Sequence, residues 1–403
     1  MSYIDELIKK LCPNGVKYEP LVNLCGTITT GRLNANEMVE NGEYPFFTCD
    51  SNPFRIDKYA FDEEAILISG NGSQVGHINY YKGKFNAYQR TYVLYNFKQI
   101  EVKFLLHYLS GYLRNYIMIH SKKGSVPYIT LPMLQNFSVP VPPLEVQCEI
   151  VHILDDFTLL SAELSAELKA REKQYKEYIN ILLSEKNIHN FKKRKLKDLF
   201  DFRNGLSKGK EFFGSGTPFV RYTDVYNKRF LHIEDIKERV NCTDKELETL
   251  KVKRGDVFFT RTSEIAEEVG YSSVMLDNIE NCVFNGFTIK ATPKTDLLIP
   301  EYCAFCFSTN EFRQYVSTRC AFTTRASLTG KTIGEFELCV PSIQEQEKIV
   351  KQLMSLYKLV NDISEGLPAE IEARQKQYEY YRDKLLTFKE FGNEWVFKFS
   401  TSL

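Results

Sequence analysis

The sequence lacks the features that most directly mark a protein that coats DNA, spans a membrane or is secreted. Its 52 Lys and Arg residues are balanced by 52 Asp and Glu residues, and a net charge of zero argues against holding nucleic acid by bulk electrostatics alone. No apolar run approaches the ~20 residues of a membrane span, and charged residues stand where a signal peptide would be apolar. We therefore expect a cytoplasmic protein without membrane contact, in which any grip on DNA comes from local patches.

Disulfide and metal signatures are missing as well. The ten cysteines are scattered without the spacing of a disulfide framework, and the six histidines do not cluster as ligands. Cys303 and Cys306 have the spacing of half a zinc site, but no second pair follows at a suitable distance and aromatic residues surround them. We expect these two cysteines to be buried thiols rather than metal ligands.

Each stretch that partly matches a known catalytic or nucleotide-binding motif departs from the full motif. Gly330-Lys331-Thr332 is similar to the end of a phosphate-binding loop, but Arg325 stands where the first glycine of that loop is needed. Gly70 to Gly76 has the glycines of a dinucleotide-binding turn with one residue too many. We therefore expect a chain that is not an enzyme, has no catalytic residues and binds no cofactor or metal of its own.

What the sequence does have is an internal duplication. Residues 141–151 match 340–350 with Val, Pro, Gln, Ile and Val at identical places, at an offset of 199. Further matches keep the same order along the chain: Thr130 with Thr329, Phe137 with Phe336, Phe85-Asn86 with Phe284-Asn285, and Gln174-Tyr175 with Gln377-Tyr378. A period near 200 residues indicates two copies of a domain rather than a solenoid.

A long helical segment follows each copy of the matched motif. Apolar or tolerated residues recur at alternating gaps of four and three, which is the spacing of a coiled-coil seam. Because no other helices would cover this seam, the two segments are expected to pair. Gly366-Leu367-Pro368 interrupts the second segment, so we expect a break or kink there. The predicted seam residues are Ile150, Leu154, Phe157, Leu164, Leu168, Tyr175 and Leu182, and Ile349, Leu353, Val360, Tyr378 and Leu385.

The two remaining regions, about 17–140 and 193–340, read as loop-rich α+β domains. Short β-like runs alternate with Gly and Asn, and each region has one helix-like stretch, 101–119 or 300–317. The basic run Lys192–Lys195 at the junction is expected to be a solvated linker, with a phosphate contact as the alternative.

Polar loops beside glycines supply the residue types that hydrogen-bond to base edges and phosphates. Taken singly such loops are usually solvated turns, but here they recur at matching places with different side chains. The candidate DNA-binding residues of the first copy are Arg32, Asn34, Asn71, Ser73, Gln74, Gln89, Arg90, Lys122, Lys123 and Ser125. Those of the second copy are Arg203, Asn204, Ser207, Lys208, Arg221, Thr223, Arg261, Thr262, Ser263, Thr324, Arg325 and Ser327.

These features together resemble one known family, the specificity subunits of type I restriction–modification systems. Leu11-Cys12-Pro13-Asn14-Gly15-Val16 is similar to the family's opening, and Gly255 to Thr262 is similar to a strand and loop of its target-recognition domain. The two Pro-x-x-x-x-Gln-x-x-Ile segments resemble its two helical regions. The resemblance covers essentially the whole chain.

The resemblance implies a non-catalytic, sequence-specific DNA-binding subunit with a pseudo-twofold α+β fold. Each of two tandem target-recognition domains would bind one half of a bipartite site in double-stranded DNA. Two long antiparallel helices, paired as a coiled coil, would set the spacing and dock two DNA adenine methyltransferase subunits, and restriction/translocase subunits can join them. S-adenosylmethionine, ATP and Mg are expected on those partners. The implied domains are 1–143 and 191–341 for target recognition, with a short N-terminal helix in the first, and 144–190 and 342–403 for the helical spacers.

Two other functions remain open from the residues alone. A two-headed coiled-coil scaffold that binds proteins would show the same duplication, and a degenerate or fused methyltransferase is disfavoured by the missing motifs.

One further feature concerns the length of the first helical spacer. Ser161 to Leu168 is a tandem Ser-Ala-Glu-Leu repeat, and our hypothesis is that its copy number tunes the gap between half-sites.

Overall fold

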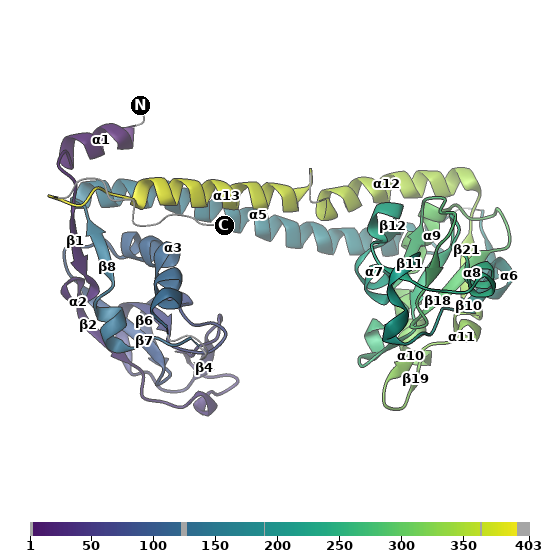
Figure 1. Cartoon of the computed structure of the whole chain (residues 1–403), viewed down its shortest axis with the longest axis horizontal. Coiled ribbons are helices and arrows are strands. Elements are labelled where there is room, and N and C mark those ends of the chain that lie inside the picture. Colours follow the sequence, from purple (N-terminus) through teal and green to yellow (C-terminus); the bar gives the residue numbers. More distant parts are fainter. Residues whose placement is uncertain (1–2, 122–126, 189, 363–364, 393–403) are drawn as a thin grey trace. The chain divides into compact units, whose positions relative to one another are not determined.

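The computed structural model describes residues 3–121, 127–188, 190–362 and 365–392 (Figure 1). Its contacts divide the chain into two compact units. Unit 1 joins Met1–Leu164 to Ile371–Leu403, and unit 2 is Ser165–Glu370. The second unit is therefore inserted, in sequence, into the first.

Unit 1 is an α+β fold with a curved sheet. Its strands form one six-stranded sheet and a separate two-stranded ribbon. The elements are α1 (Tyr3–Leu11), β1 (Lys17–Pro20), α2 (Leu21–Leu24), β2 (Cys25–Thr30), β3 (Tyr44–Phe47), β4 (Phe54–Ile56), β5 (Phe61–Ser69), β6 (Ile78–Ala87), β7 (Thr91–Phe97), α3 (Val102–His120), α4 (Leu131–Gln135), β8 (Ser138–Val141), the first part of α5 (Leu144–Leu182) and most of α13 (Leu367–Leu386). The sheet order is β2-β7-β5-β6-β3-β4, and β1 pairs with β8.

The sheet of unit 1 is covered on both faces. Along β5, Ile66 and Ile68 enter the cluster that contains Phe104 of α3, whereas Ala65 and Leu67 enter a second cluster on the opposite face. Both faces of the sheet are therefore buried at β5, which explains why residues 65–68 form a continuous apolar run instead of an alternating one.

Unit 2 repeats the plan with shorter strands and more irregular turns. The elements are the rest of α5, β9 (Lys192–Lys195), α6 (Leu196–Leu199), β10 (Phe200–Asn204), β11 (Phe213–Val220), α7 (Tyr222–Asn227), β12 (Phe230–Leu231), β13 (Arg239–Val240), α8 (Asp244–Leu250), β14 (Val257–Thr260), β15 (Thr262–Ser263), β16 (Ser272–Met275), β17 (Val283–Phe284), β18 (Thr288–Pro293), α9 (Pro300–Cys306), α10 (Asn310–Arg319), β19 (Ala321–Phe322), β20 (Ala326–Ser327), α11 (Gly330–Gly334), β21 (Glu337–Val340) and α12 (Ile343–Asn361). Its main sheet has the order β10-β18-β14-β16-β12, and β9 pairs with β21 as β1 pairs with β8.

A buried glutamine joins the start of the long helix to the domain in each unit. Gln147 accepts from the backbone N–H of Glu101 at 2.7 Å and donates to the carbonyl of Pro142 at 2.7 Å. Gln346, at the same offset of 199, accepts from Ile299 N at 3.0 Å and donates to Leu297 O and Pro341 O. Both glutamines have no exposed surface. The predicted duplication therefore extends to individual hydrogen bonds.

The long helices carry the predicted seam. α5 runs without interruption for 39 residues, and α13 packs along its first part in unit 1, as Figure 1 shows. Phe157 of α5 stacks on Tyr381 of α13 with ring centroids 5.2 Å apart, and in unit 2 Tyr175 meets Tyr357 of α12. The buried predicted residues are Ile150, Leu154, Tyr175, Ile349, Leu353, Val360 and Leu385, and the half-buried ones are Phe157, Leu164, Leu168, Leu182 and Tyr378.

Three local expectations can be checked in the structure. The break in the second helix is confirmed, because α12 ends at Asn361 and α13 begins at Leu367. A side chain at Gly366 would lie within 3 Å of the carbonyl oxygens of Lys358, Leu359 and Asp362, so this turn excludes other residues. The stretch 101–119 is confirmed as α3. The stretch 300–317 is instead two helices, because the Thr309 hydroxyl accepts from Phe312 N and starts α10.

Two further expectations concern single residues. Cys303 and Cys306 are buried in the core of unit 2, and burial raises the pKa of the Cys303 thiol to about 12. The linker interpretation of Lys192–Lys195 is wrong. These residues form β9, because each pairs with a residue of β21, and Lys195 together with Lys197 pairs with Glu335.

Candidate nucleic-acid interface

Four loops of unit 1 meet beside Ser69 and Thr91, where β5 ends and β7 begins. They are 31–34, 70–77, 88–90 and 127–130. Hydrogen bonds tie them together: Gln89 N donates to Leu33 O, Gly70 N to Arg90 O, and Ile129 N to Gly70 O, each at 2.8–2.9 Å. Together they line a cavity of about 370 Å³ whose walls are Thr30, Gly70, Asn71, Gln89, Arg90, Tyr92, Pro127, Tyr128 and Ile129.

The structure brings several of the predicted DNA-binding residues of unit 1 to this place. Gln89 donates to the side-chain oxygen of Asn34 at 3.0 Å, and Asn71 lies 3.1 Å from the thiol of Cys49. Arg32, Ser73, Gln74 and Arg90 are exposed. Lys122, Lys123 and Ser125 lie outside the described residues. Asn71, Gln89 and Arg90 thus place polar side chains in one concavity whose other walls are largely apolar, and such side chains suit contacts with base edges.

Unit 2 builds the same arrangement beside Thr260 and Thr288. Gly286 N donates to Leu206 O, Arg261 N to Phe287 O, and Leu328 N to Arg261 O, which are the counterparts of the three bonds in unit 1. β15 and β19 flank β20 in a small sheet on this surface, which we call the unit 2 loop face. The recurring framework with different side chains is the geometry expected of two domains that bind different sequences.

The matching loop of each unit closes on a glycine whose positive φ would strain any other residue. Gly76 and Gly270 have φ of +79° and +72°, and their N–H groups donate to Ser69 O and Thr260 O. A Cβ atom would approach within 2.9 Å of Ile117 at Gly76 and 3.0 Å of Val316 at Gly270. This close approach fixes where each loop begins and ends.

Most predicted cations of unit 2 have protein partners. Lys208 is mostly buried and pairs with Glu246 at 2.9 Å. The pKa of Glu246 is held below its usual value by the backbone N–H of Thr243 and by Lys208, which favours the ionised carboxylate. Other contacts of the predicted residues are Arg221 with Asp224 and Glu238, Arg325 with Glu264, Arg203 with Thr249 O, Arg261 with Gly286 O, and Ser263 with Glu268.

The remaining predicted residues of unit 2 divide between the face and its surroundings. Thr262 and Ser327 face each other in the pairing of β15 with β20, and Thr324 is exposed in the turn between β19 and β20. Asn204 and Ser207 are exposed beside the glycine-containing loop. Arg221 and Thr223 stand at the start of α7, where the Arg221 guanidinium is held by acids. Among the described residues, more of the predicted DNA-binding side chains are therefore bonded within the protein in unit 2 than in unit 1.

Sequence reasoning missed large apolar side chains on the unit 2 loop face. Phe287 and Phe322 are 58% and 61% exposed, and Ile265 on the neighbouring loop is exposed as well. Their signal in the sequence is weak, because a phenylalanine in a short run beside glycine or alanine reads as core. Their exposure shows that unit 2 presents apolar as well as polar groups there.

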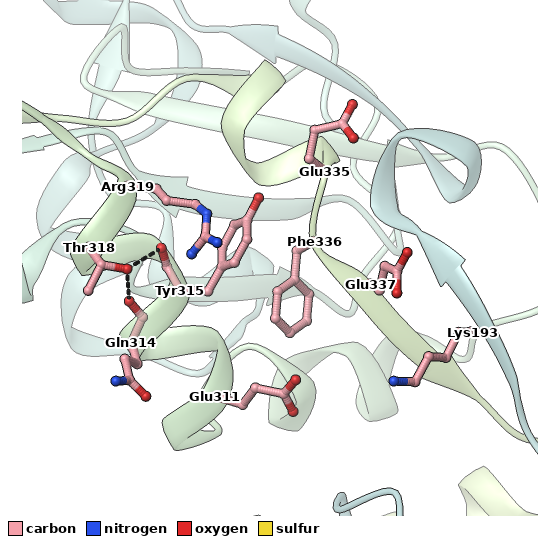
Figure 2. Close-up of a pocket in the computed structure, with 9 residues that line it drawn as sticks. All are labelled: Lys193, Glu311, Gln314, Tyr315, Thr318, Arg319, Glu335, Phe336 and Glu337. Carbon is pink, nitrogen blue, oxygen red and sulfur yellow. Dashed lines mark hydrogen bonds between the residues drawn. The ribbon is translucent and has the colours of Figure 1, made fainter.

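A second cavity of unit 2, of about 400 Å³, has a different character. Figure 2 shows Tyr315 and Arg319 of α10 on one side and Phe336 and Glu337 across from them. The Arg319 guanidinium lies 4.2 Å from the Tyr315 ring centroid. The lining includes Glu311, Glu335 and Glu337 against Lys193 and Arg319. Three carboxylates against two cations disfavour phosphate, so this cavity is not part of the candidate DNA interface.

Residues 13–171 and 188–373 match the family model of the type I restriction modification DNA specificity domain. The chain belongs to the family of type I restriction–modification specificity subunits. A Haemophilus influenzae chain provisionally named as such a specificity subunit is 27% identical over 412 residues, spanning 96% of this chain and 98% of its own length. A type I specificity subunit of Escherichia coli is 32% identical over 281 residues, or 68% of this chain and 66% of its own. The solved S subunit from M. genitalium shares the fold, with a TM-score of 0.53 at 15% identity over 92% of this chain and 96% of that one.

The specificity subunit is non-catalytic and supplies DNA specificity to a type I restriction–modification complex. Within the described ranges, no group of three or more His, Cys, Asp or Glu side chains is arranged to hold a metal ion. Over the same ranges, no helix has both the length and the apolar character needed to cross a membrane.

Proposed function

We propose that each unit of this specificity subunit reads one half of a bipartite site in double-stranded DNA, through the loops that meet beside Ser69 and Thr260. The observation that carries this proposal is the repeated hydrogen-bond framework of those loops, on which the exposed side chains differ between units. Residues 1–143 and 191–341 are the proposed target-recognition domains, and 144–190 and 342–403 the helical spacers.

In this proposal the number of residues in α5 sets the gap between the half-sites. α5 begins in unit 1 and ends in unit 2 as one helix of 39 residues, or roughly 58 Å at about 1.5 Å per residue. Such a helix resists bending far more than a loop does, so a change in its length would be transmitted rather than absorbed.

The same helices would dock two DNA adenine methyltransferase subunits. Leu159 on α5 and Tyr380 on α13 are 60% and 64% exposed, and a docked partner would cover these apolar side chains. Methyl transfer, S-adenosylmethionine, ATP and Mg would then belong to the methyltransferase and restriction/translocase partners.

The proposal is tested by mapping adenine methylation in the source genome with the gene present, deleted and restored. Deletion should abolish methylation at one two-part motif, and restoration should return it, which gives both half-sites and their spacing. The partner methyltransferase must be detected in the deletion strain as a control. An unchanged map in that strain would overturn the proposal and favour a scaffold that binds proteins.

A further inference from the structure

One three-residue turn lies at the centre of the four loops in each unit. In unit 1 it is Tyr88-Gln89-Arg90, directly after β6. Tyr88 N donates to Phe47 O, Gln89 N to Leu33 O, and Thr91 N back to Tyr88 O, while Arg90 O accepts from Gly70 N. The turn is thus fixed by its backbone to three other segments of the unit, and its side chains are left to make other contacts.

The counterpart in unit 2 is Asn285-Gly286-Phe287, directly after β17. Asn285 N donates to Val220 O, Gly286 N to Leu206 O, and Thr288 N back to Asn285 O, while Phe287 O accepts from Arg261 N. Every backbone bond of the first turn therefore has its equivalent, which we take to define Arg90 and Phe287 as the same position. The expected match of Phe85-Asn86 with Phe284-Asn285 is wrong, because Val220 pairs with Phe284 as Phe47 pairs with Ala87, two residues later in unit 1. We call it the third turn position.

The third turn position is exposed in both units but differs in chemistry. Arg90 is exposed and lines the cavity of about 370 Å³ with Asn71 and Gln89. Among the described residues its guanidinium has no hydrogen-bond or ion-pair partner. Phe287 is 58% exposed, and its N–H is held by the side-chain oxygen of Asn285 at 2.6 Å. Phe287 is thus the exposed apolar side chain that the turn holds at the position of Arg90.

The charged residues around the third turn position also differ between the two units. In unit 2, two cations of the loop face have partners within the protein. Arg325 lies 3.2 Å from Glu264, and the Arg261 guanidinium donates to Gly286 O at 3.2 Å. Arg261 occupies the position that Gly70 has in unit 1, and its guanidinium contacts the turn through the Gly286 carbonyl. The unit 2 turn thus presents a ring where the unit 1 turn presents a cation that has no partner among the described residues.

We propose that the third turn position determines base specificity in each half-site, with Arg90 reading a guanine and Phe287 reading a thymine. The inference rests on the proposed function. An arginine fork donates two parallel hydrogen bonds to N7 and O6 of guanine in the major groove, a pattern that no other base presents. Phenylalanine makes no hydrogen bond, and its apolar contact in that groove is the C5 methyl group of thymine.

The test uses the chain assembled with its methyltransferase and DNA that carries the half-sites from the methylation map. Each guanine is replaced in turn by 7-deazaguanine, which lacks the N7 acceptor, and each thymine by deoxyuridine, which lacks the methyl group. One 7-deazaguanine should weaken binding by about tenfold in the native complex. One deoxyuridine in the other half-site should weaken it by about fourfold.

Each base is assigned to a side chain by asking whether the protein variant abolishes the effect of the base substitution. In Arg90→Ala the sensitive 7-deazaguanine should have no further effect, and in Phe287→Ala the same should hold for the sensitive deoxyuridine. Arg32→Ala and Phe322→Ala are the matched controls, since each removes an exposed residue of the same type. Whatever each control does to the overall affinity, its ratio of affinities for native and substituted DNA should stay that of the native complex. An undiminished ratio in Arg90→Ala or Phe287→Ala, or a half-site without the required base, overturns the assignment for that unit.

Failure of the inference and failure of the proposed function give different results. If no two-part motif depends on the gene, the proposed function is wrong. If the motif exists and binds tightly but neither variant shows coupling, only the third turn position has been misassigned. The two side chains are exposed and the turn is held by backbone bonds, so the variants are expected to fold as the native chain does.

Discussion

The buried ion pair of unit 2 is predicted to be costly to break on one side and inexpensive to remove on both. Asp256 precedes β14 and has no exposed surface, and its carboxylate accepts from the Lys290 ammonium at 3.0 Å and from Lys253 N at 2.8 Å. Lys290 is 5% exposed, also donates to Lys251 O, and lies 5.5 Å from the Phe284 ring centroid. Water therefore has little access to either charge.

Asp256→Ala should destabilise unit 2 by about 3–5 kcal/mol, because it leaves the Lys290 ammonium buried without a counter-charge. Adding Lys290→Met in that background removes the uncompensated charge and keeps the apolar stem. It should restore all but the lost hydrogen bonds at Lys253 N and Lys251 O, each worth about 1 kcal/mol. Unit 1 supports this expectation, because at the equivalent strand positions it has Ala65 and Val93, both fully buried.

The assay is amide hydrogen exchange followed by mass spectrometry on peptides from β14 and β18, which measures the local free energy of opening. Peptides from β5 and β7 of unit 1 provide the internal control and should be unchanged in every variant. If Asp256→Ala lowers the protection of β14 by less than about 1 kcal/mol, or if Lys290→Met does not recover it, the reasoning from burial is refuted.

Three other predictions concern the two buried glutamines, His107 of α3 and the tandem repeat of α5. Gln147→Leu and Gln346→Leu each leave buried backbone groups unpaired, so each should lower the opening free energy of its own unit by about 1–3 kcal/mol in hydrogen exchange and spare the other unit. Burial lowers the pKa of His107, so the stability present at neutral pH should be lost as the pH falls below about 6.5, and His107→Asn should flatten the pH dependence of exchange in α13. A third Ser-Ala-Glu-Leu inserted after Leu168 lengthens α5 by about 6 Å and should widen the methylated motif's gap by less than about two base pairs, without changing either half-site.

The pH prediction depends on the groups that face His107. Its ring nitrogens lie 3.0 Å from Asp155 of α5 and from the hydroxyl of Tyr378 of α13, and Lys103 pairs with the same aspartate. Asp155 favours the protonated ring, but burial outweighs it and the pKa of the imidazole is lowered. Because amide exchange is itself base-catalysed, the quantity to compare is the opening free energy of α13 after correction for the intrinsic exchange rate at each pH. An opening free energy that does not fall below about pH 6.5 in the native chain would show that the neutral ring is not needed for this packing.

Local pattern was enough to predict the duplicated architecture. Residues 65–68 and 257–260 are strands because an apolar run of this length buries both faces of a sheet, and α5 is a helix because its apolar residues recur every three or four positions. The break before Leu367 follows from Gly366 and Pro368, whose backbone limits act within a few residues. The offset of 199 was visible because matched residues make matched contacts, as Gln147 and Gln346 do.

Only the tertiary structure decided which polar side chains are available to DNA. Lys208, Arg221 and Arg325 are basic residues, as Arg32 and Arg90 are, yet each of the three forms an ion pair with an acid of its own unit. The partner Glu246 is 38 residues from Lys208 in sequence, and no local pattern encodes such a pairing. The exposure of Phe287 is likewise set by which loops surround its turn. Periodicity reports the short-range constraints of helix and strand, whereas the charge and shape of an interface depend on contacts between distant segments.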